Sequence, residues 1–209
     1  MDVYESMLAI DYKIVLGAAA TILGFIGYVP YVRDTLRGTT RPHIFSWLTW
    51  GIMETIAFFA QVAKGAGAGA WATGTSAVIM FFIIGITLTH ADKQIRPFDW
   101  VALFGALVGI VLWRLTNSPL LAIIFVTIAD AFGFIPTFRK AYRKPHEETL
   151  FEYVCSAMKW IVSLPAIGAF NLATALYPIS LIFTNSAFVI MALVRRKSIL
   201  SEEFSNDVR

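Results

Sequence analysis

The chain has 209 residues, of which 57% are hydrophobic and only 15% are charged. This composition, with a mean hydropathy of +0.68, excludes an ordinary soluble domain and indicates a protein embedded in a lipid bilayer. The net charge of +3 does not indicate a nucleic-acid-binding protein, because the basic residues lie in short clusters between apolar stretches, where they act as topology signals.

Seven apolar stretches follow one another along the chain, and each is long enough to cross a hydrocarbon core of roughly 30 Å at about 1.5 Å per residue. We expect helices, because transmembrane strands would alternate apolar and polar residues, which these stretches do not. The seven predicted helices cover about residues 14–33, 43–63, 69–89, 98–115, 119–138, 149–170 and 174–194. The sequence therefore predicts an all-α membrane protein with seven transmembrane helices. We expect no cleaved secretory signal, because the N-terminal residues lack a basic segment followed by a short apolar core.

The Lys and Arg residues between these stretches predict the orientation of the helices. One side of the membrane would carry Arg33, Arg37, Arg41, Lys93, Arg96, Arg139, Lys140, Arg143, Lys144, Arg195, Arg196 and Lys197. The other side would carry Lys13, Lys64 and Arg114. An excess of Lys and Arg marks the cytoplasmic side, so we expect the N-terminus outside and the C-terminus in the cytoplasm. The protein would be a multi-pass protein of the plasma or inner membrane.

One segment of the sequence returns in a similar form further along the chain. GFIGYVPYVRDTLR, residues 24–37, aligns with DAFGFIPTFRKAYR, residues 130–143, at an offset of 106 residues (Pro30 to Pro136). The aligned identities are Gly27 with Gly133, Pro30 with Pro136, Arg33 with Arg139, Arg37 with Arg143 and Phe45 with Phe151. Self-similarity at a fixed offset indicates two copies of one structural unit.

The repeat explains the number of predicted helices. Helices 1–3 and 5–7 would form two parallel three-helix repeats, and the fourth helix would link them so that both repeats run the same way. The predicted divisions are residues 1–97 for the first repeat, 98–118 for the linker helix, 119–197 for the second repeat and 198–209 for a cytoplasmic tail.

Seven helices in a 3+1+3 arrangement, with a proline and a basic turn at the cytoplasmic end of the first helix of each repeat, resemble the PQ-loop superfamily, which includes the SWEET sugar transporters. The resemblance covers roughly residues 14–196 and implies a transporter that works by alternating access. In that family such prolines lie near a cytoplasmic gate, a place that Pro30 and Pro136 match. The glutamine that gives the superfamily its name is replaced by Tyr31 and Thr137.

A proline inside a helix removes one backbone hydrogen bond and kinks the helix, at a cost of about 3 kcal/mol. Because Pro30 and Pro136 recur at matched depth, we favour a hinge role for both. The alternative is that neighbouring helices compensate for the lost hydrogen bonds, as they do for many transmembrane prolines.

Four polar side chains fall near the middle of the predicted helices: Glu54, Asp130, Lys159 and Asn185. An ionisable group there costs about 2.5 to 3.5 kcal/mol on insertion scales, which predicts that these groups are paired or functional. Two carboxyls and one ammonium leave one negative charge, which a bound proton would neutralise. We therefore expect Asp130 and Glu54 to couple transport to protons. The alternative is a buried ion pair between Lys159 and one acid that only fixes the packing.

The resemblance also suggests where a solute binds. In SWEET transporters an asparagine in the third helix of each repeat holds the substrate; Asn185 matches the second, whereas Ile79 stands at the first. We expect a solute site formed by Asn185, Lys159, Trp50, Ser76 and Trp160. A buried lysine favours a small polar solute with a carboxylate or an amine, such as an amino acid or organic acid, over a neutral sugar.

Other functions have weaker support in the sequence. His43, His90 and His146 are far apart at predicted membrane edges, so we expect neither an enzyme nor a metal or cofactor site. A ligand-binding receptor on the same scaffold stays open as an alternative, since a fold does not determine a function. A retinal-type photoreceptor, with a Schiff base on Lys159, ranks below both. The expected partners are a small solute, protons and the lipid bilayer, without nucleic acid.

Three further segments have local interpretations. The glycine-rich residues 65–74 predict a tight external turn and close helix packing. Gly105 and Gly109 form a GxxxG pattern, which indicates either packing within the chain or a homo-oligomer. RKPHEET, residues 143–149, is interpreted as a solvated cap, with Pro145 and Thr149 suited to starting the sixth helix.

Overall fold

The computed structural model describes residues 3–87 and 97–207, and the predicted topology signals Lys93 and Arg96, with His90, lie outside these residues. The described chain is almost entirely helical, as the composition predicts. Its α-helices are α1 (Val3–Leu36), α2 (Ile44–Ala63), α3 (Trp71–Thr87), α4 (Pro97–Thr116), α5 (Pro119–Arg143), α6 (Leu150–Ser163) and α7 (Leu172–Asp207). Three short 3-10 helices accompany them: η1 (Gly67–Ala70), η2 (Pro145–Glu147) and η3 (Leu164–Ala166).

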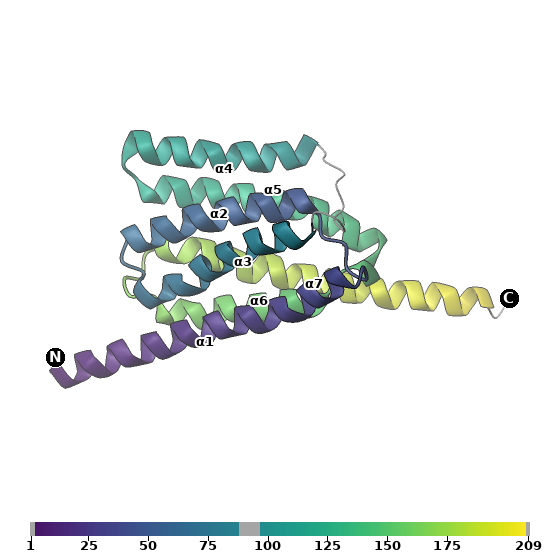
Figure 1. Cartoon of the computed structure of the whole chain (residues 1–209), viewed down its shortest axis with the longest axis horizontal. Coiled ribbons are helices and arrows are strands. Elements are labelled where there is room, and N and C mark those ends of the chain that lie inside the picture. Colours follow the sequence, from purple (N-terminus) through teal and green to yellow (C-terminus); the bar gives the residue numbers. More distant parts are fainter. Residues whose placement is uncertain (1–2, 88–96, 208–209) are drawn as a thin grey trace.

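Four of the described helical segments are long and apolar enough to cross a membrane, as expected for an all-α membrane protein. These segments are Tyr12–Leu36, Gly67–Ile86, Pro119–Arg143 and Leu172–Ile199. They belong to α1, α3, α5 and α7, which run in the same direction in Figure 1, whereas α2, α4 and α6 run in the opposite direction. The helices therefore alternate in direction along the chain.

The sixth helix is shorter than its predicted range of residues 149–170. α6 ends at Ser163 after 14 residues, because Pro165 has no backbone N–H to continue the α-helical hydrogen bonds. The chain then forms η3 and a non-helical segment up to α7. At 1.5 Å per residue α6 is about 21 Å long, which is less than the hydrocarbon core of roughly 30 Å. The prediction of a sixth continuous α-helix of transmembrane length is therefore wrong.

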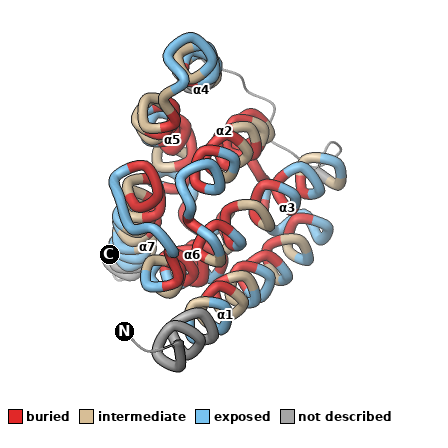
Figure 2. The backbone as a smooth tube through the Cα atoms, turned by 90° about the vertical axis from the view of Figure 1, so that its left-hand side faces the viewer, coloured by how far each residue is buried: buried red, intermediate tan, exposed pale blue. Residues whose placement is uncertain are grey.

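Six helices form a closed ring when the molecule is viewed along their axes (Figure 2). Contacts follow the order α1, α3, α2, α5, α7, α6 and return to α1, so α3 lies between α1 and α2 and α7 lies between α5 and α6. α4 stays outside this ring and packs on α5 and α2. Buried residues face the inside of the ring, which places the core along its axis.

Glycines let α1 and α5 closely approach their ring neighbours α6 and α2. A Cβ on Gly27 would lie 2.7 Å from the Cβ of Cys155 in α6, and a Cβ on Gly133 would lie 3.1 Å from Nε1 of Trp50 in α2. Both helices continue through a proline three residues later, Pro30 in α1 and Pro136 in α5. The two aligned segments thus make matching contacts, each with a helix from the other half of the chain.

The glycine-rich turn and the GxxxG pattern both serve packing within the chain. Gly65 and Gly67 have φ of +78° and +57°, which only glycine adopts readily, and they form the turn between α2 and η1. In α4, a Cβ on Gly105 would lie 3.0 Å from Cβ of Ala129, and one on Gly109 would lie 3.2 Å from Cβ of Phe125. The GxxxG pattern therefore faces α5 of the same chain.

The segment at residues 143–149 is only partly the solvated cap that the sequence indicates, since Arg143, Lys144 and His146 are exposed but Pro145 and Glu148 are buried. Glu148 is buried and forms a salt bridge with Lys140 at 2.7 Å. Arg196 of α7 donates hydrogen bonds to the carbonyl oxygens of Pro145 and Glu148, each at 2.8 Å. Pro145 and Glu148 are buried because α7 continues past the bundle and brings Arg196 against them. Burial raises the pKa of the Glu148 carboxyl from its ordinary value, and the nearby charge of Lys140 opposes that increase.

Candidate functional site

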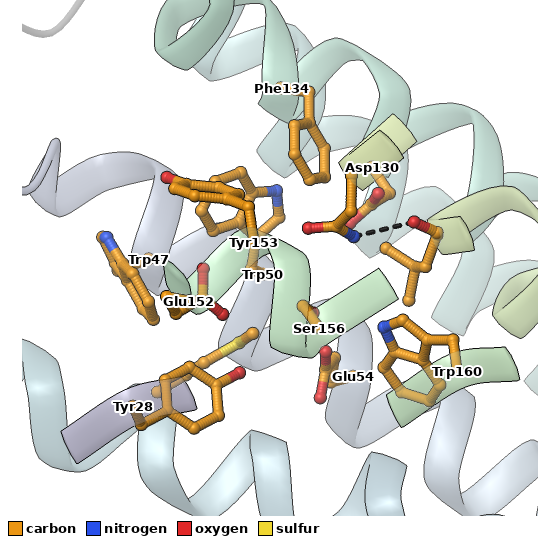
Figure 3. Close-up of a pocket in the computed structure, with 13 residues that line it drawn as sticks. Tyr28, Trp47, Trp50, Glu54, Asp130, Phe134, Glu152, Tyr153, Ser156 and Trp160 are labelled. Carbon is orange, nitrogen blue, oxygen red and sulfur yellow. Dashed lines mark hydrogen bonds between the residues drawn. The ribbon is translucent and has the colours of Figure 1, made fainter. Parts of the chain in front are cut away.

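A small cavity lies inside the helix ring and is lined by all six ring helices (Figure 3). Its volume is about 20 Å³, which is room for about one water molecule. The lining residues are Tyr28, Trp47, Trp50, Glu54, Met80, Asp130, Phe134, Glu152, Tyr153, Ser156, Trp160, Leu181 and Asn185. A cavity in the core of a bundle, with polar groups from several helices, is a typical place for a ligand.

Three buried carboxylates line this cavity, each from a different helix. Glu54 of α2 and Asp130 of α5 are each 2% exposed, and Glu152 of α6 is 5% exposed. The structure thus brings the predicted pair Glu54 and Asp130 into one cavity. Glu152 was not predicted as a site residue, although it lies seven positions before Lys159 and so shares its helix face. That spacing was the signal for a third acid.

Asp130 points into the bundle and contacts a second helix. The hydroxyl of Tyr177 in α7 donates a hydrogen bond to its Oδ1 at 3.4 Å. Tyr177 is fully buried, so the contact lies in the core between α5 and α7. Asp130 is therefore turned neither to the lipid nor only to its own helix.

Lys159 lies beside the cavity and not on its wall. Its Nζ donates a hydrogen bond of 2.5 Å to Oγ of Ser76 in α3, and its alkyl chain passes Gly24 of α1, where a Cβ would lie 3.1 Å from Cδ. The ammonium lies 4.3 Å from the ring centroid of Trp160 and 5.5 Å from that of Tyr28. Glu54 and Glu152 are the carboxylates that interact with it electrostatically.

The direct ion pair of Lys159 with one acid, which was the alternative interpretation of the sequence, is not formed. Among the described residues, no carboxylate oxygen lies within the 4.0 Å salt-bridge distance of its Nζ. The hydroxyl of Ser76 lies between the two charges instead, because Ser76 is a hydrogen-bond partner of both Lys159 and Glu54. Ser76 and Lys159 therefore support the cavity, whereas the predicted solute residues Trp50, Trp160 and Asn185 line it.

Two polar groups of the cavity have no hydrogen-bond partner among the described residues. They are Oε2 of Glu54 and Nε1 of Trp50, both in α2 and both buried. Asn185 is partly satisfied, because its Nδ2 donates to the carbonyl oxygen of Leu181 one turn earlier at 2.7 Å. Buried polar groups in folded proteins are nearly always hydrogen-bonded, so unpartnered ones that line a cavity indicate a ligand or a change of conformation.

No protein-family model, curated protein or solved structure matches the chain. The cavity and the architecture around it are therefore the features that indicate a function. The ring of His43 accepts a hydrogen bond from the backbone N–H of Ser46 at the start of α2, and His146 lies exposed in η2.

Hydrogen bonds close the end of the ring near Pro30 and Pro136. Thr149, which precedes α6, donates to Oδ2 of Asp34 at 3.0 Å, and its hydroxyl lies 2.6 Å from that of Thr40. Lys140 donates to the carbonyl oxygen of Arg41. Asp34 and Lys140 each lie four residues after one of the two prolines, so both halves contribute a side chain to this closure.

Proposed function

We propose that the chain is a membrane transporter for a small polar solute, that it works by alternating access, and that it is coupled to protons. The observation that carries this proposal is the cavity inside the helix ring with Glu54, Asp130 and Glu152 on its wall. Three acids in the core of a membrane protein are costly, so their retention favours a role in binding or in proton transfer. The seven helices would all cross the membrane, with α6 completed by η3 and the segment that follows it.

The architecture supports two parallel three-helix repeats of the PQ-loop type, with α4 as the linker. In each half the third helix lies between the first and the second, and α1 contacts α6 as α5 contacts α2. Helices α1 and α5 also run in the same direction (Figure 1). A scaffold of this kind can open at one end and then at the other by motion of one repeat against the other around a fixed site.

The basic residues support an N-terminus outside and a C-terminus in the cytoplasm. Most of those described lie in the last turns of α1 and α5, in the connections that follow these two helices, or in the later part of α7, at the end of the bundle where α1 and α5 finish. At the other end the described basic residues are Lys13, Lys64 and Arg114. The closure by Asp34, Thr149 and Lys140 would then be a cytoplasmic gate, and Pro30 and Pro136 lie next to it.

Proton coupling is supported by the excess of acids over bases. Three carboxylates and one ammonium leave two negative charges if all are ionised, and a low-dielectric site opposes that state. A proton bound to one carboxyl lowers the cost of burying these charges. Release of that proton when a solute binds would couple proton movement to solute movement. A buried tyrosine hydroxyl, that of Tyr177, already donates to Asp130 and can stabilise its ionised form.

The deciding experiment is flux in liposomes that contain the purified protein and an internal pH dye. A pH gradient would be imposed, and mixtures of amino acids, organic acids, amines or glucose would be added outside in separate runs. The proposal expects one mixture to change the rate of proton movement in the wild-type protein and not in Asp130→Asn. Saturable binding of a mixture without any flux would instead favour a receptor on the same scaffold.

A further inference from the structure

We propose that the central cavity binds a small organic cation, an amine or quaternary ammonium ion, in preference to an anion or a neutral sugar. The inference concerns the same cavity and rests on the proposed transport function for its biological use. It narrows the solute to one charge class, which the sequence left open between carboxylate and amine.

The balance of charge at the cavity wall selects a cation. Among the described residues, the wall carries three carboxylates, Glu54, Asp130 and Glu152, and no basic side chain. The nearby Lys159 is held by Ser76 and by two aromatic rings, and Glu54 and Glu152 already act on its charge. An anionic solute would add to an excess of negative charge in a low-dielectric site, whereas a cation would reduce it.

The aromatic lining is suited to a cation as well. Six aromatic side chains line the cavity, and several of them form a continuous wall: the ring centroids of Trp47 and Trp50 lie 5.7 Å apart, and those of Trp50 and Phe134 lie 4.7 Å apart. Faces of Trp, Tyr and Phe rings attract ammonium groups, and cages of such rings are a known means of binding quaternary ammonium ions. An anion gains no such attraction from the ring faces, and a neutral sugar lacks the charge that they attract.

The protein itself holds an ammonium against two of these rings. Nζ of Lys159 lies 4.3 Å from the centroid of Trp160 and 5.5 Å from that of Tyr28, and both rings also line the cavity. The opposite part of the wall offers the same elements without a cation: an aromatic pair, Trp50 and Phe134, and the carboxylate of Asp130. At that part of the wall, a ligand ammonium would have aromatic rings and a carboxylate as neighbours, as the ammonium of Lys159 does.

The two unpartnered polar groups indicate which atoms the ligand carries. Oε2 of Glu54 can only accept when the carboxyl is ionised, so a ligand that satisfies it must donate from an N–H or O–H group. Nε1 of Trp50 can only donate and needs an oxygen from the ligand or from a water. An ammonium ion that also bears a hydroxyl group supplies both kinds of partner.

The test uses choline and its neutral analogue of the same shape, 3,3-dimethylbutan-1-ol, with acetate as the anion. Titration calorimetry on the purified full-length protein in detergent would measure the binding of each probe. We expect saturable choline binding, at least tenfold weaker binding of the neutral analogue and no binding of acetate. Equal binding of choline and its neutral analogue, tighter binding of acetate or the absence of choline binding would each overturn the proposal.

Variants test whether choline binds in the cavity, and they distinguish such binding from an effect of the net charge of the protein. Glu152→Gln and Trp50→Leu should each weaken choline binding at least tenfold, whereas Glu147→Gln removes a carboxylate from η2, outside the cavity, and should leave it unchanged. If Glu147→Gln weakened binding as much as Glu152→Gln, the cavity would not be the site. The comparison of choline with its neutral analogue needs only the wild-type protein, so a variant that fails to fold does not remove the test.

The calorimetric test and the flux test can overturn the cation site and the transport function separately. Choline binding in detergent without any solute flux in liposomes would overturn the transporter and keep the cation site. Flux of an organic acid or of glucose by a protein that does not bind choline would keep the transporter and overturn the cation site.

The small size of the cavity means that choline binding requires the ring helices to separate. We therefore also expect binding to be slow or temperature-dependent.

Discussion

The ammonium of Lys159 donates a hydrogen bond of 2.5 Å to the hydroxyl of Ser76, and this contact joins α6 to α3 in the core of the bundle. The two residues are 83 positions apart and belong to different halves of the chain. Ser76 also interacts with Glu54 of α2, so one hydroxyl connects an acid and a base that do not touch. The contact ties three helices to each other beside the cavity.

Replacing Lys159 with methionine should destabilise the protein strongly. The variant leaves Glu54 and Glu152 without the nearby positive charge, and removing one member of a buried charged group costs about 3 to 5 kcal/mol. Ser76→Ala is the matched comparison, because it removes the hydrogen bond and keeps the charge, and should cost about 1.5 to 3 kcal/mol. Unfolding in a detergent and denaturant series would measure both losses. A smaller loss for Lys159→Met than for Ser76→Ala would mean that its charge does not stabilise the carboxylates.

Asp130→Asn should abolish proton-coupled uptake and leave the fold intact. The amide is nearly the same size as the acid and can still accept a hydrogen bond from Tyr177, so the melting temperature should change little. Proton flux and solute flux in liposomes would measure the functional loss. Glu147→Gln, which removes an acid outside the ring, should keep full activity. Proton-driven uptake that persists in Asp130→Asn would assign the coupling to Glu54 or Glu152 instead.

Lys140→Met should make the free energy of unfolding more sensitive to pH, because the buried Glu148 carboxyl then titrates without its salt-bridge partner. Burial raises the pKa of Glu148 in the folded state, so folding favours its protonated form and stability decreases as the pH rises through that pKa. Lys140 opposes the shift, and its removal raises the pKa further. The variant should therefore lose about 3 kcal/mol or more at pH 8 and much less near pH 4.

Melting curves between pH 4 and pH 8 would measure this difference. The double variant Lys140→Met with Glu148→Gln provides the control, because it has no carboxyl at residue 148 to titrate. The stability of the double variant should not show the additional pH dependence of the single variant. The same pH dependence in the single and double variants would show that another group titrates.

Gly27→Ala should be more harmful than its counterpart Gly133→Ala. A Cβ at Gly27 would meet the Cβ of Cys155 at 2.7 Å, an atom fixed close to the backbone, whereas a Cβ at Gly133 would meet the edge of the Trp50 ring at 3.1 Å. Overpacking of this kind costs about 1 to 3 kcal/mol. Gly85→Ala is the control, because no atom lies within 4 Å of its added Cβ. Thermal unfolding should rank Gly27→Ala lowest and Gly85→Ala unchanged or higher.

Single cysteines should report the orientation of the bundle. In a Cys155→Ser background, cysteines at positions 37 and 143 should react with a membrane-impermeant reagent only after the membrane is opened. Cysteines at positions 64 and 117 should react from outside in intact cells. Labelling of position 37 or 143 in intact cells would reverse the topology, and the closure near the two prolines would then face outwards.

The helix positions could be predicted because apolar stretches in a bilayer must satisfy their own backbone hydrogen bonds. Those bounds agree with the structure to within a few residues for α2, α4 and the start of α5. The sixth helix was predicted too long because its apolar composition continues past Pro165. A prediction from apolar composition does not take into account that Pro165 lacks the backbone N–H that a continuous helix needs. The extension of α7 past the bundle could not be predicted, since residues 195–203 are charged and polar and look like a tail.

The acids of the cavity were only partly predictable. Depth along a helix suggested Glu54 and Asp130, and both line the cavity. Glu152 was overlooked as a site residue because it lies near the start of its helix, where charged residues are common. The direction in which Lys159 points could not be obtained from the sequence either, since it depends on the space that Gly24 leaves and on the position of Ser76, which lie in other helices.

The short α6 also affects the lipid around the protein. Its outer face carries exposed apolar side chains at helical spacing, Phe151, Val154, Met158 and Ile161, which α6 would present to the acyl chains in the proposed seven-span arrangement. A helix of about 21 Å beside a hydrocarbon layer of roughly 30 Å creates a hydrophobic mismatch, which the bilayer relieves by thinning at that place. If the chain is the proposed transporter, acyl-chain length would then enter the energetics of any motion of α6 against α1, and the thickness of the host membrane would regulate the proposed gate.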